Sequence, residues 1–351
     1  MTDLLLMSEN SSSDLMTDEE LDLLRTTLTK DYQPTTRDRL NRNLTRFFVW
    51  VAYGESGWSE MIDERRGTRA HKRNDPRKAL VSERLSHLSR EFLGGGRLKA
   101  IARVARYREF LKGLDYAPAT VNSYLWAVRE MVAQAKRLEV VDWTLRDIEG
   151  VPSETLRDTR GTGLEGMQAI FNAVHRGTPE GDRNYALVIL LFQNALRRGE
   201  VVGCNVSHFD PAAKTLSIQG KGKRDRARVD LSSSVVEAIA AWLERRETAG
   251  LNEPLFCALD RNHHSMRLTG TSVYRIVRKL AKDAGVSDRF SPHKIRHSAI
   301  TAVLDITNGD LRSAQALSRH KSMDILKIYD DNRQQLQGKA SGLLEQAVST
   351  L

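Results

Sequence analysis

The chain has 351 residues, a length typical of two or three domains, and 40% of them are hydrophobic, which is enough for packed cores and excludes a disordered chain. A formal net charge of +9 favours a polyanionic partner, most simply nucleic acid. The low aromatic content of 6% favours duplex DNA, because single strands are bound by stacking their bases on aromatic side chains.

Membrane association and metal binding have little support in the sequence. No apolar run approaches the roughly 18 residues of a membrane span, and we find no signal peptide or lipidation motif, so we expect a cytoplasmic protein that binds no membrane. Cys204 and Cys257 are isolated, which predicts buried free thiols in a reducing compartment. His263 and His264 lack a third ligand at suitable spacing, so we predict no metal site there.

The first 76 residues predict an N-terminal extension of helical and basic character. Between Thr36 and Gly54 a helical pattern places leucines and phenylalanines on one face and four arginines on the other. These arginines are Arg37, Arg39, Arg42 and Arg46. Their face is either solvated or in contact with phosphates, and basic residues continue through 65–78, the first plausible linker. The role of residues 1–76 stays open between DNA-arm binding, protein contacts and simple packing.

Residues 77–152 predict a helical domain with a positive exterior. Helices are expected over 79–92 and 98–114, and a third begins after Pro118, each with an apolar stripe that core packing explains. The stretch 150–163 is rich in Pro, Gly, Ser and Thr, which predicts a domain boundary.

The second half of the chain combines helices with a single clear β signal. Residues 184–196 predict a nearly all-apolar, buried helix that runs into Leu-Arg-Arg-Gly-Glu at 196–200. An arginine at the end of a buried helix is costly unless it faces a cleft or a partner. Strands at 215–218 and 226–231 flank a basic turn, Gly-Lys-Gly-Lys at 220–223, which brings backbone and an ammonium group close to any anion. Further helices are expected at 166–174, 233–246 and 271–284.

Histidines, an arginine and a tyrosine gather between residues 293 and 329. The window holds His-Lys-Ile-Arg-His at 293–297, an apolar helix, Arg-His at 319–320 and Ile-Tyr at 328–329. A packed core does not need this arrangement. A phosphate-handling site would use all of it, provided an arginine and a lysine arrive from elsewhere in the chain.

Taken in order, these motifs resemble the tyrosine recombinase (phage integrase) family. The family pattern is Gly-Leu-Arg-x-x-Glu, a Gly-Lys-Gly hairpin, His-x-x-Arg-His, Gly-His and a tyrosine. The intervals agree: 24 residues separate Arg197 from Lys221, and nine separate His320 from Tyr329. The likeness covers about residues 160–335 well and 77–150 more loosely.

The resemblance implies a mainly α fold with a small antiparallel β-sheet or hairpin. A helical core DNA-binding domain at 77–152 and a mixed α/β catalytic domain at 160–335 would close as a C-shaped clamp on DNA. The tail, 336–351, is a candidate docking helix for a neighbouring protomer, or it packs on its own domain. The implied partner is double-stranded DNA carrying a specific recombination site, bound by a homotetramer, and no metal, ATP or other cofactor is implied.

The resemblance also assigns a catalytic set. Its members are Arg197, Lys221, His293, Arg296, His320 and the nucleophile Tyr329. Arg197 and Arg296 would each donate paired N–H groups to the nonbridging phosphate oxygens. Tyr329 would form a 3′-phosphotyrosyl link, and Lys221, with Lys223 as its rival, would protonate the leaving 5′-oxygen. The two histidines would supply hydrogen bonds around the phosphate and the phenol.

Three positions depart from the family pattern. Ala195 and Arg319 stand where the family has glycine, and Ser298 stands where it usually has threonine. Arg319 adds bulk and charge next to His320. His297 is left out of the catalytic set, because a histidine beside Arg296 can simply brace its helix.

We therefore expect a site-specific DNA recombinase that exchanges strands through a Holliday junction. A type IB topoisomerase shares the nucleophile but acts as a monomer. A catalytically silent DNA-binding protein on the same fold is the third hypothesis, although such a protein would be free to lose some of the six residues.

Overall fold

The computed structural model describes residues 32–60, 62–63, 70–71, 76–152, 161–220, 225–246, 250–287 and 290–334, with isolated positions nearer both termini. The chain divides into two compact units, Met1–Thr155 and Leu156–Leu351, and each is described by itself. None of the described helices is both long enough and apolar enough to cross a membrane.

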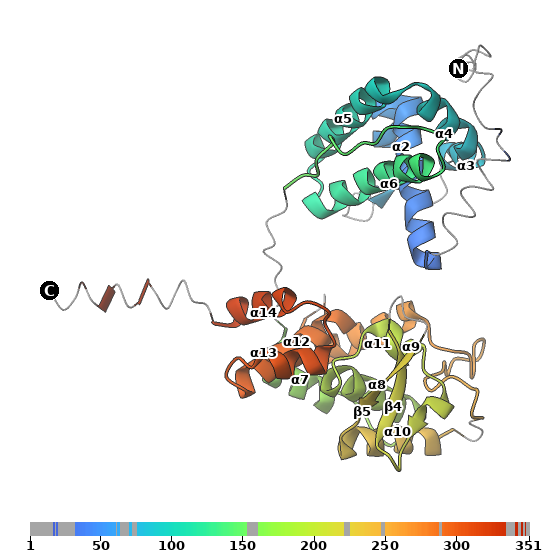
Figure 1. Ribbon diagram of the computed structural model, residues 1–351. Coiled ribbons are helices and arrows are strands. Elements are labelled where there is room, and N and C mark those ends of the chain that lie inside the picture. The colour runs from blue at the N-terminus through green and yellow to red at the C-terminus, as the bar shows by residue number, and fades with distance from the viewer. Residues whose placement is uncertain are drawn as a thin grey trace. The chain divides into compact units, whose positions relative to one another are not determined.

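The first unit is built from helices (Figure 1). Helix α2 packs against α6, and it is kinked at Gly54, whose φ of 65° lies in the left-handed region that glycine tolerates. The elements are α2 (Pro34–Glu60), β1 (Ile62–Asp63), β2 (Ala70–His71), α3 (Pro76–Glu83), α4 (Leu85–Gly94), α5 (Arg97–Gly113) and α6 (Pro118–Arg137).

Helix α2 belongs to the core of the first unit. Phe47 and Trp58 are fully buried there, and both rings pack edge-on against Tyr107 of α5, with centroid distances of 5.1 and 5.8 Å. The sequence leaves this segment open between DNA-arm binding, protein contacts and simple packing. The structure gives residues 34–60 a packing role, while the residues before Tyr32, apart from Thr17 and Glu19, lie outside the described ones.

Two arginines of α2 stack on aromatic rings of α6. The guanidinium of Arg39 lies 4.7 Å from the ring centroid of Trp126, and that of Arg46 lies 5.1 Å from Tyr124. The arginine face of α2, which the sequence left open between solvent and phosphate contact, thus also contributes to helix packing.

The second unit combines helices with one small sheet (Figure 1). Strands β3 (Phe209–Asp210), β4 (Thr215–Gln219) and β5 (Arg226–Asp230) form an antiparallel sheet in the order β3-β4-β5. The expected fold class, mainly helical with a small antiparallel sheet, is confirmed. The helices are α7 (Gly163–Asn172), α8 (Pro179–Gln193), α9 (Arg198–Val202), α10 (Ser233–Glu244), α11 (Gly270–Asp283), α12 (Pro292–Ile306), α13 (Leu311–Ser318) and α14 (Asp324–Gln334), with a short 3₁₀ turn, η2 (Val206–His208).

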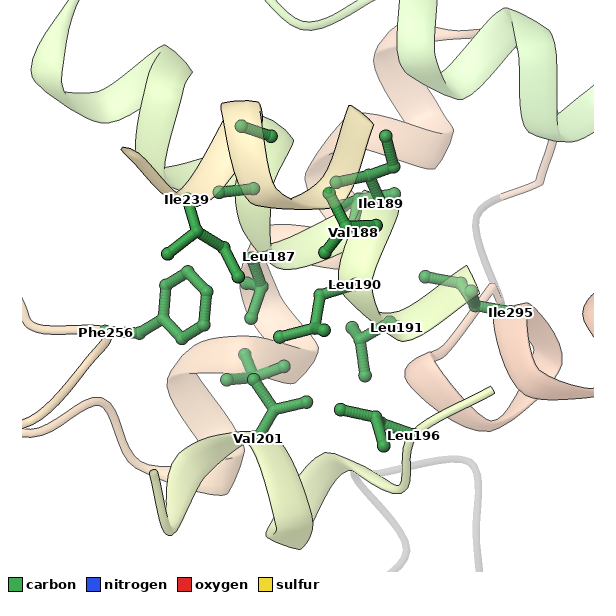
Figure 2. Close-up of a cluster of buried hydrophobic side chains, with 14 of the residues drawn as sticks. Leu187, Val188, Ile189, Leu190, Leu191, Leu196, Val201, Ile239, Phe256 and Ile295 are labelled. Atoms are coloured by element: carbon green, nitrogen blue, oxygen red, sulfur yellow. The ribbon is translucent and has the colours of Figure 1, made fainter. Parts of the chain in front are cut away.

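Helix α8 forms the centre of the main core of this unit. Thr178 caps its start by accepting a hydrogen bond from the Gly181 amide, and Pro179 takes the first helical position. Leu187, Leu190 and other apolar side chains of α8 point into a cluster with Ile239 of α10 and neighbouring elements (Figure 2). This burial explains why the second half of the helix, residues 185–192, is apolar on all sides.

A second, smaller cluster joins α12, α13 and α14. Its fully buried members are Ile300, Leu304, Ala314 and Leu326, and Tyr329 packs with them. The three helices lie together in Figure 1, so the two histidine motifs and the tyrosine are carried by one packed group.

Candidate active site

Helix α12 carries the first histidine motif. Ser291 caps the helix by accepting from the Lys294 amide, and Pro292 occupies the first turn. The spacing of three places His293 and Arg296 on one face of the helix.

Arg296 is almost completely buried, with 1% of its surface exposed. Its Nη1 donates to the carbonyl of Ala195 and its Nη2 to the carbonyl of Ser318. Burial, together with the charges of Arg197 and Arg319, lowers the pKa of Arg296 to about 10. The group therefore stays charged at neutral pH and connects the end of α8 to the end of α13.

Arg197 lies at the start of α9, directly after the buried end of the α8 region. Its Nη1 donates to Glu200 Oε1 at 2.9 Å, and its backbone amide donates to Glu200 Oε2 at 2.8 Å. Glu200 is only 3% exposed, whereas the side chain of Arg197 remains 38% exposed. The carboxylate thus anchors a guanidinium whose remaining donors can reach a ligand.

His320 follows α13 and contacts Arg296. Arg296 Nη2 lies 3.2 Å from His320 Nε2, and Ser318 Oγ lies 3.1 Å from His320 Nδ1. Burial, followed by the charges of Arg296, Arg197, His293 and Arg319, lowers the pKa of His320 to about 4. His320 is therefore neutral at pH 7.

Tyr329 of α14 lies against a row of imidazole rings. Its ring centroid is 5.2 Å from that of His297 in an edge-on arrangement and 6.2 Å from that of His320. The ring of His297 in turn lies 4.3 Å from that of His293. Tyr329 is only 4% exposed.

A cavity of about 440 Å³ opens beside these groups. Arg197, His293 and Arg296 contribute to its lining, whereas Tyr329 does not. The remaining lining residues are Leu196, Arg198, Gly199, Tyr274, Ser291 and Pro292. A cavity lined by three arginines and a histidine is suited to an anion such as a phosphodiester.

The structure does not describe the position of the expected hairpin lysine. Lys221 and its rival Lys223 lie outside the described residues. The strands that flank them are in register, with Gln219 opposite Arg226. Of the six assigned residues, the structure brings Arg197, His293, Arg296, His320 and Tyr329 together. Among the residues that the structure describes, no group of three or more His, Cys, Asp or Glu side chains is placed to hold a metal ion.

Three supporting residues were missed or given a minor part by the sequence. His297 lies between the rings of His293 and Tyr329. Ser298 Oγ accepts from the Thr162 amide at 2.9 Å and donates to the Lys294 carbonyl, so its hydroxyl joins α12 to the chain before α7. Arg319 contacts Glu200. The departures from the family pattern at Ser298 and Arg319 were the signals available in the sequence.

Comparison with known proteins gives a consistent result. Residues 164–335 match the model of the phage integrase family. A tyrosine recombinase of Synechocystis sp. is 43% identical over 253 residues, which cover 72% of this chain and 81% of that protein. A tyrosine recombinase of Synechococcus elongatus is 36% identical over 324 residues, 92% of either chain.

Solved structures share the fold at low identity. The XerH site-specific recombinase bound to its palindromic difH substrate matches with a TM-score of 0.60 and 18% identity, covering 89% of this chain and 97% of that one. The Tn1549 transposon integrase in complex with transposon right end DNA matches with a TM-score of 0.54 and 15% identity, covering 79% and 97%. From the sequence relatives and the matched model together, the chain belongs to the phage integrase family of tyrosine recombinases.

Proposed function

We propose that this chain is a site-specific DNA recombinase that cleaves and rejoins duplex DNA through a 3′-phosphotyrosyl intermediate on Tyr329. The single observation that carries the proposal is the convergence of Arg197, His293 and Arg296 on one cavity, with His320 and Tyr329 directly behind it. The sequence relatives named tyrosine recombinases, and the DNA-bound solved proteins of the same fold, support DNA as the partner.

The chemistry follows from these groups. Tyr329 gives its phenolic proton to a neighbouring histidine, for which the neutral His320 is our candidate, and its oxygen attacks the scissile phosphorus. An O–P bond to tyrosine forms, and the bond to the 5′-oxygen breaks. The leaving 5′-oxygen takes a proton, for which Lys221 is our candidate. Arg197 and Arg296 stabilise the charge that develops on the nonbridging oxygens, and in this role fixed cations are more effective than water. The phosphotyrosyl bond conserves the energy of the diester, so rejoining needs no ATP.

Tyr329 has to approach the phosphate for this reaction. It is buried against His297 and His320 and lies outside the lining of the cavity. We therefore infer that part of α14 shifts when DNA occupies the cavity. The small cluster around Leu326 holds one side of this helix.

We further propose that four protomers act on one specific site and exchange strands through a Holliday junction, in the cytoplasm, where DNA is accessible. The two units would close around the duplex as a clamp, and the tail at 336–351, most of which lies outside the described residues, would dock on a neighbour or on its own unit. Integration, excision or resolution of a DNA element would each use this same chemistry.

A covalent-capture experiment tests the proposal. A pool of duplexes with random central sequence, each nicked so that a short fragment diffuses away after cleavage, traps the covalent intermediate. We expect wild-type protein to form adducts that survive detergent and carry an enriched sequence. Tyr329→Phe, which keeps the ring and removes the nucleophilic oxygen, should form none. Adducts from Tyr329→Phe, or none from wild type, would contradict the assignment.

The same adducts separate the alternatives. Adducts without sequence enrichment, together with relaxation of supercoiled plasmid by monomers, would indicate a topoisomerase. Sequence-selective binding with no adduct would indicate a silent DNA-binding protein.

A further inference from the structure

Two residues of the site adopt a backbone conformation that favours glycine. Ala195 has a φ of 44° and Arg319 a φ of 56°, both in the left-handed region. These are the two positions at which the family pattern has glycine. At Arg319 the conformation ends α13 as a left-handed cap, immediately before His320. A non-glycine residue is disfavoured here, so the side chain of Arg319 has to compensate.

The side chains of Arg319 and Arg296 form two parallel bridges between the same two segments of chain. Arg296 joins the carbonyls of Ala195 and Ser318. Arg319 Nη1 donates to the carbonyls one residue earlier in each segment, that of Asn194 at 3.1 Å and that of Leu317 at 2.8 Å. One segment leads into Arg197, which lines the cavity, and the other into His320, which lies behind it. Both bridges therefore fix the separation of these two residues.

Arg319 has a third partner, which connects it to Arg197. Its Nη2 lies 3.3 Å from Glu200 Oε2, while Glu200 Oε1 accepts from Arg197. We propose that Arg319 is a positioning residue. Its side-chain bridges stabilise the left-handed backbone conformation that a glycine would adopt without strain. They hold Arg197, through Glu200, and His320 in place for the phosphate. This inference rests on the proposed recombinase function.

The pH dependence of adduct formation distinguishes a positioning role from a merely structural one, because the charges around His320 set its pKa. Among the residues that the structure describes, the ionisable groups that act on it or contact its ring are Arg296 and His293 on α12, Arg197 before α9, Arg319 in its own segment and the Tyr329 phenol on α14. Each of the three arginines disfavours the imidazolium form. Removing Arg319 takes away one cation, so the pKa of His320 rises and the imidazole becomes protonated at higher pH.

The test compares variants in covalent-adduct formation on the nicked duplex, measured across pH. Arg319→Gly suits the left-handed conformation and removes the bridge together with its charge, whereas Arg319→Lys keeps a charge without the planar fork. Arg312→Ala is the matched control, because Arg312 is an exposed arginine on the same helix. Thermal unfolding and affinity for intact duplex are measured in parallel.

We expect Arg319→Gly to remain folded and to bind duplex, but to form adduct about tenfold to a hundredfold more slowly, since misplacing catalytic groups by about 1 Å can cost about a hundredfold in rate. The acid limb of its rate profile should move to higher pH. Arg319→Lys should be slowed without a comparable shift, and Arg312→Ala should match wild type. In a Glu200→Gln background the Arg319→Gly change should slow adduct formation by a smaller factor than it does in wild type, because the two changes share their effect on Arg197 while the bridge to the carbonyls is still lost.

Two results overturn the inference and point to different faults. If wild type forms adduct and Arg319→Gly forms it equally fast with an unchanged pH profile, Arg319 does not position the site and the proposed function stands. If wild type itself forms no adduct, the proposed function fails and the inference fails with it.

Discussion

Arg296 donates from Nη2 to His320 Nε2 across 3.2 Å, and this contact determines which tautomer the neutral histidine adopts. A guanidinium can only donate, so Nε2 must accept, and the proton of the neutral ring lies on Nδ1. From there it can be donated to Ser318 Oγ at 3.1 Å. Both hydrogens of Nη2 are thereby engaged, by His320 and by the Ser318 carbonyl. A phosphate entering the cavity competes with His320 and with the backbone for the same guanidinium.

The first prediction concerns pH. The pKa of His320 falls from 6.5 to about 4 on folding, so between these values the unfolded chain binds a proton that the folded protein does not. The stability from this group is fully present above about pH 6.5 and is lost as the pH falls toward 4. Relative to His320→Gln, wild type should therefore lose thermal stability as the pH is lowered through that window. The melting-temperature difference between the two proteins, measured in steps of pH, tests this.

Other titrating groups are common to both proteins, so they largely cancel in that difference. A difference that stays flat from neutral pH to pH 4 would show that the ring is exposed to water rather than held neutral beside Arg296.

The second prediction is that Arg296→Lys reduces both stability and cleavage. A lysine ammonium lacks the planar fork that reaches the Ala195 and Ser318 carbonyls together, so one buried carbonyl loses its donor. We expect a loss of about 2 kcal/mol in the free energy of unfolding, the range for hydrogen bonds to charged groups. Adduct formation should fall further than the folded fraction does. Full stability with slow cleavage would mean that Arg296 acts on the phosphate alone.

The sequence was sufficient to predict the fold class and to nominate the residues of the site, because the order and spacing of the motifs can be read directly along the chain. It could not predict that Arg296 would be almost fully buried between two turns, since that depends on where the ends of α8 and α13 meet. Nor could it predict that Tyr329 would pack against His297, because the ring's burial is decided by the cluster beneath α14. Simple packing was one of the alternatives that the sequence left open for the segment containing α2. The sequence could not select it, because the arginines of α2 stack on rings of α6, a helix distant along the chain.

The third prediction concerns the support beneath Tyr329. Leu326 is fully buried one turn before the tyrosine and packs with Ile300 and Leu304 of α12. Leu326→Ala should leave a cavity and destabilise α14 by about 2–5 kcal/mol locally. We expect faster hydrogen exchange at α14 amides, whereas amides of α8, which belong to the other cluster, should be unaffected. Equal acceleration in both helices would indicate global unfolding instead.

The rate of adduct formation by Leu326→Ala distinguishes two roles of the cluster, which are holding Tyr329 away from the cavity and orienting its phenol. If its packing holds Tyr329 away from the cavity, loosening α14 should keep or raise the rate of adduct formation per folded molecule. A rate that falls in proportion to the added motion would show that the same packing also aims the phenol.

The fourth prediction tests the contact between α12 and the chain that enters α7. A Cβ added at Gly161 would lie 2.5 Å from the Ser298 backbone nitrogen and would overlap its hydroxyl, and a backbone atom cannot rotate away. Gly161→Ala should therefore push the two segments apart, break the Thr162–Ser298 hydrogen bond and cost about 1–3 kcal/mol. Gly199→Ala is the control, because an added Cβ there meets nothing within 4 Å and lies in helix α9, where alanine is favoured. Thermal unfolding should rank Gly161→Ala well below wild type, with Gly199→Ala level with it or above. The reverse ranking would show that the segment before α7 is not held by Ser298, and that the hydroxyl at the position of the family's threonine serves the site in some other way.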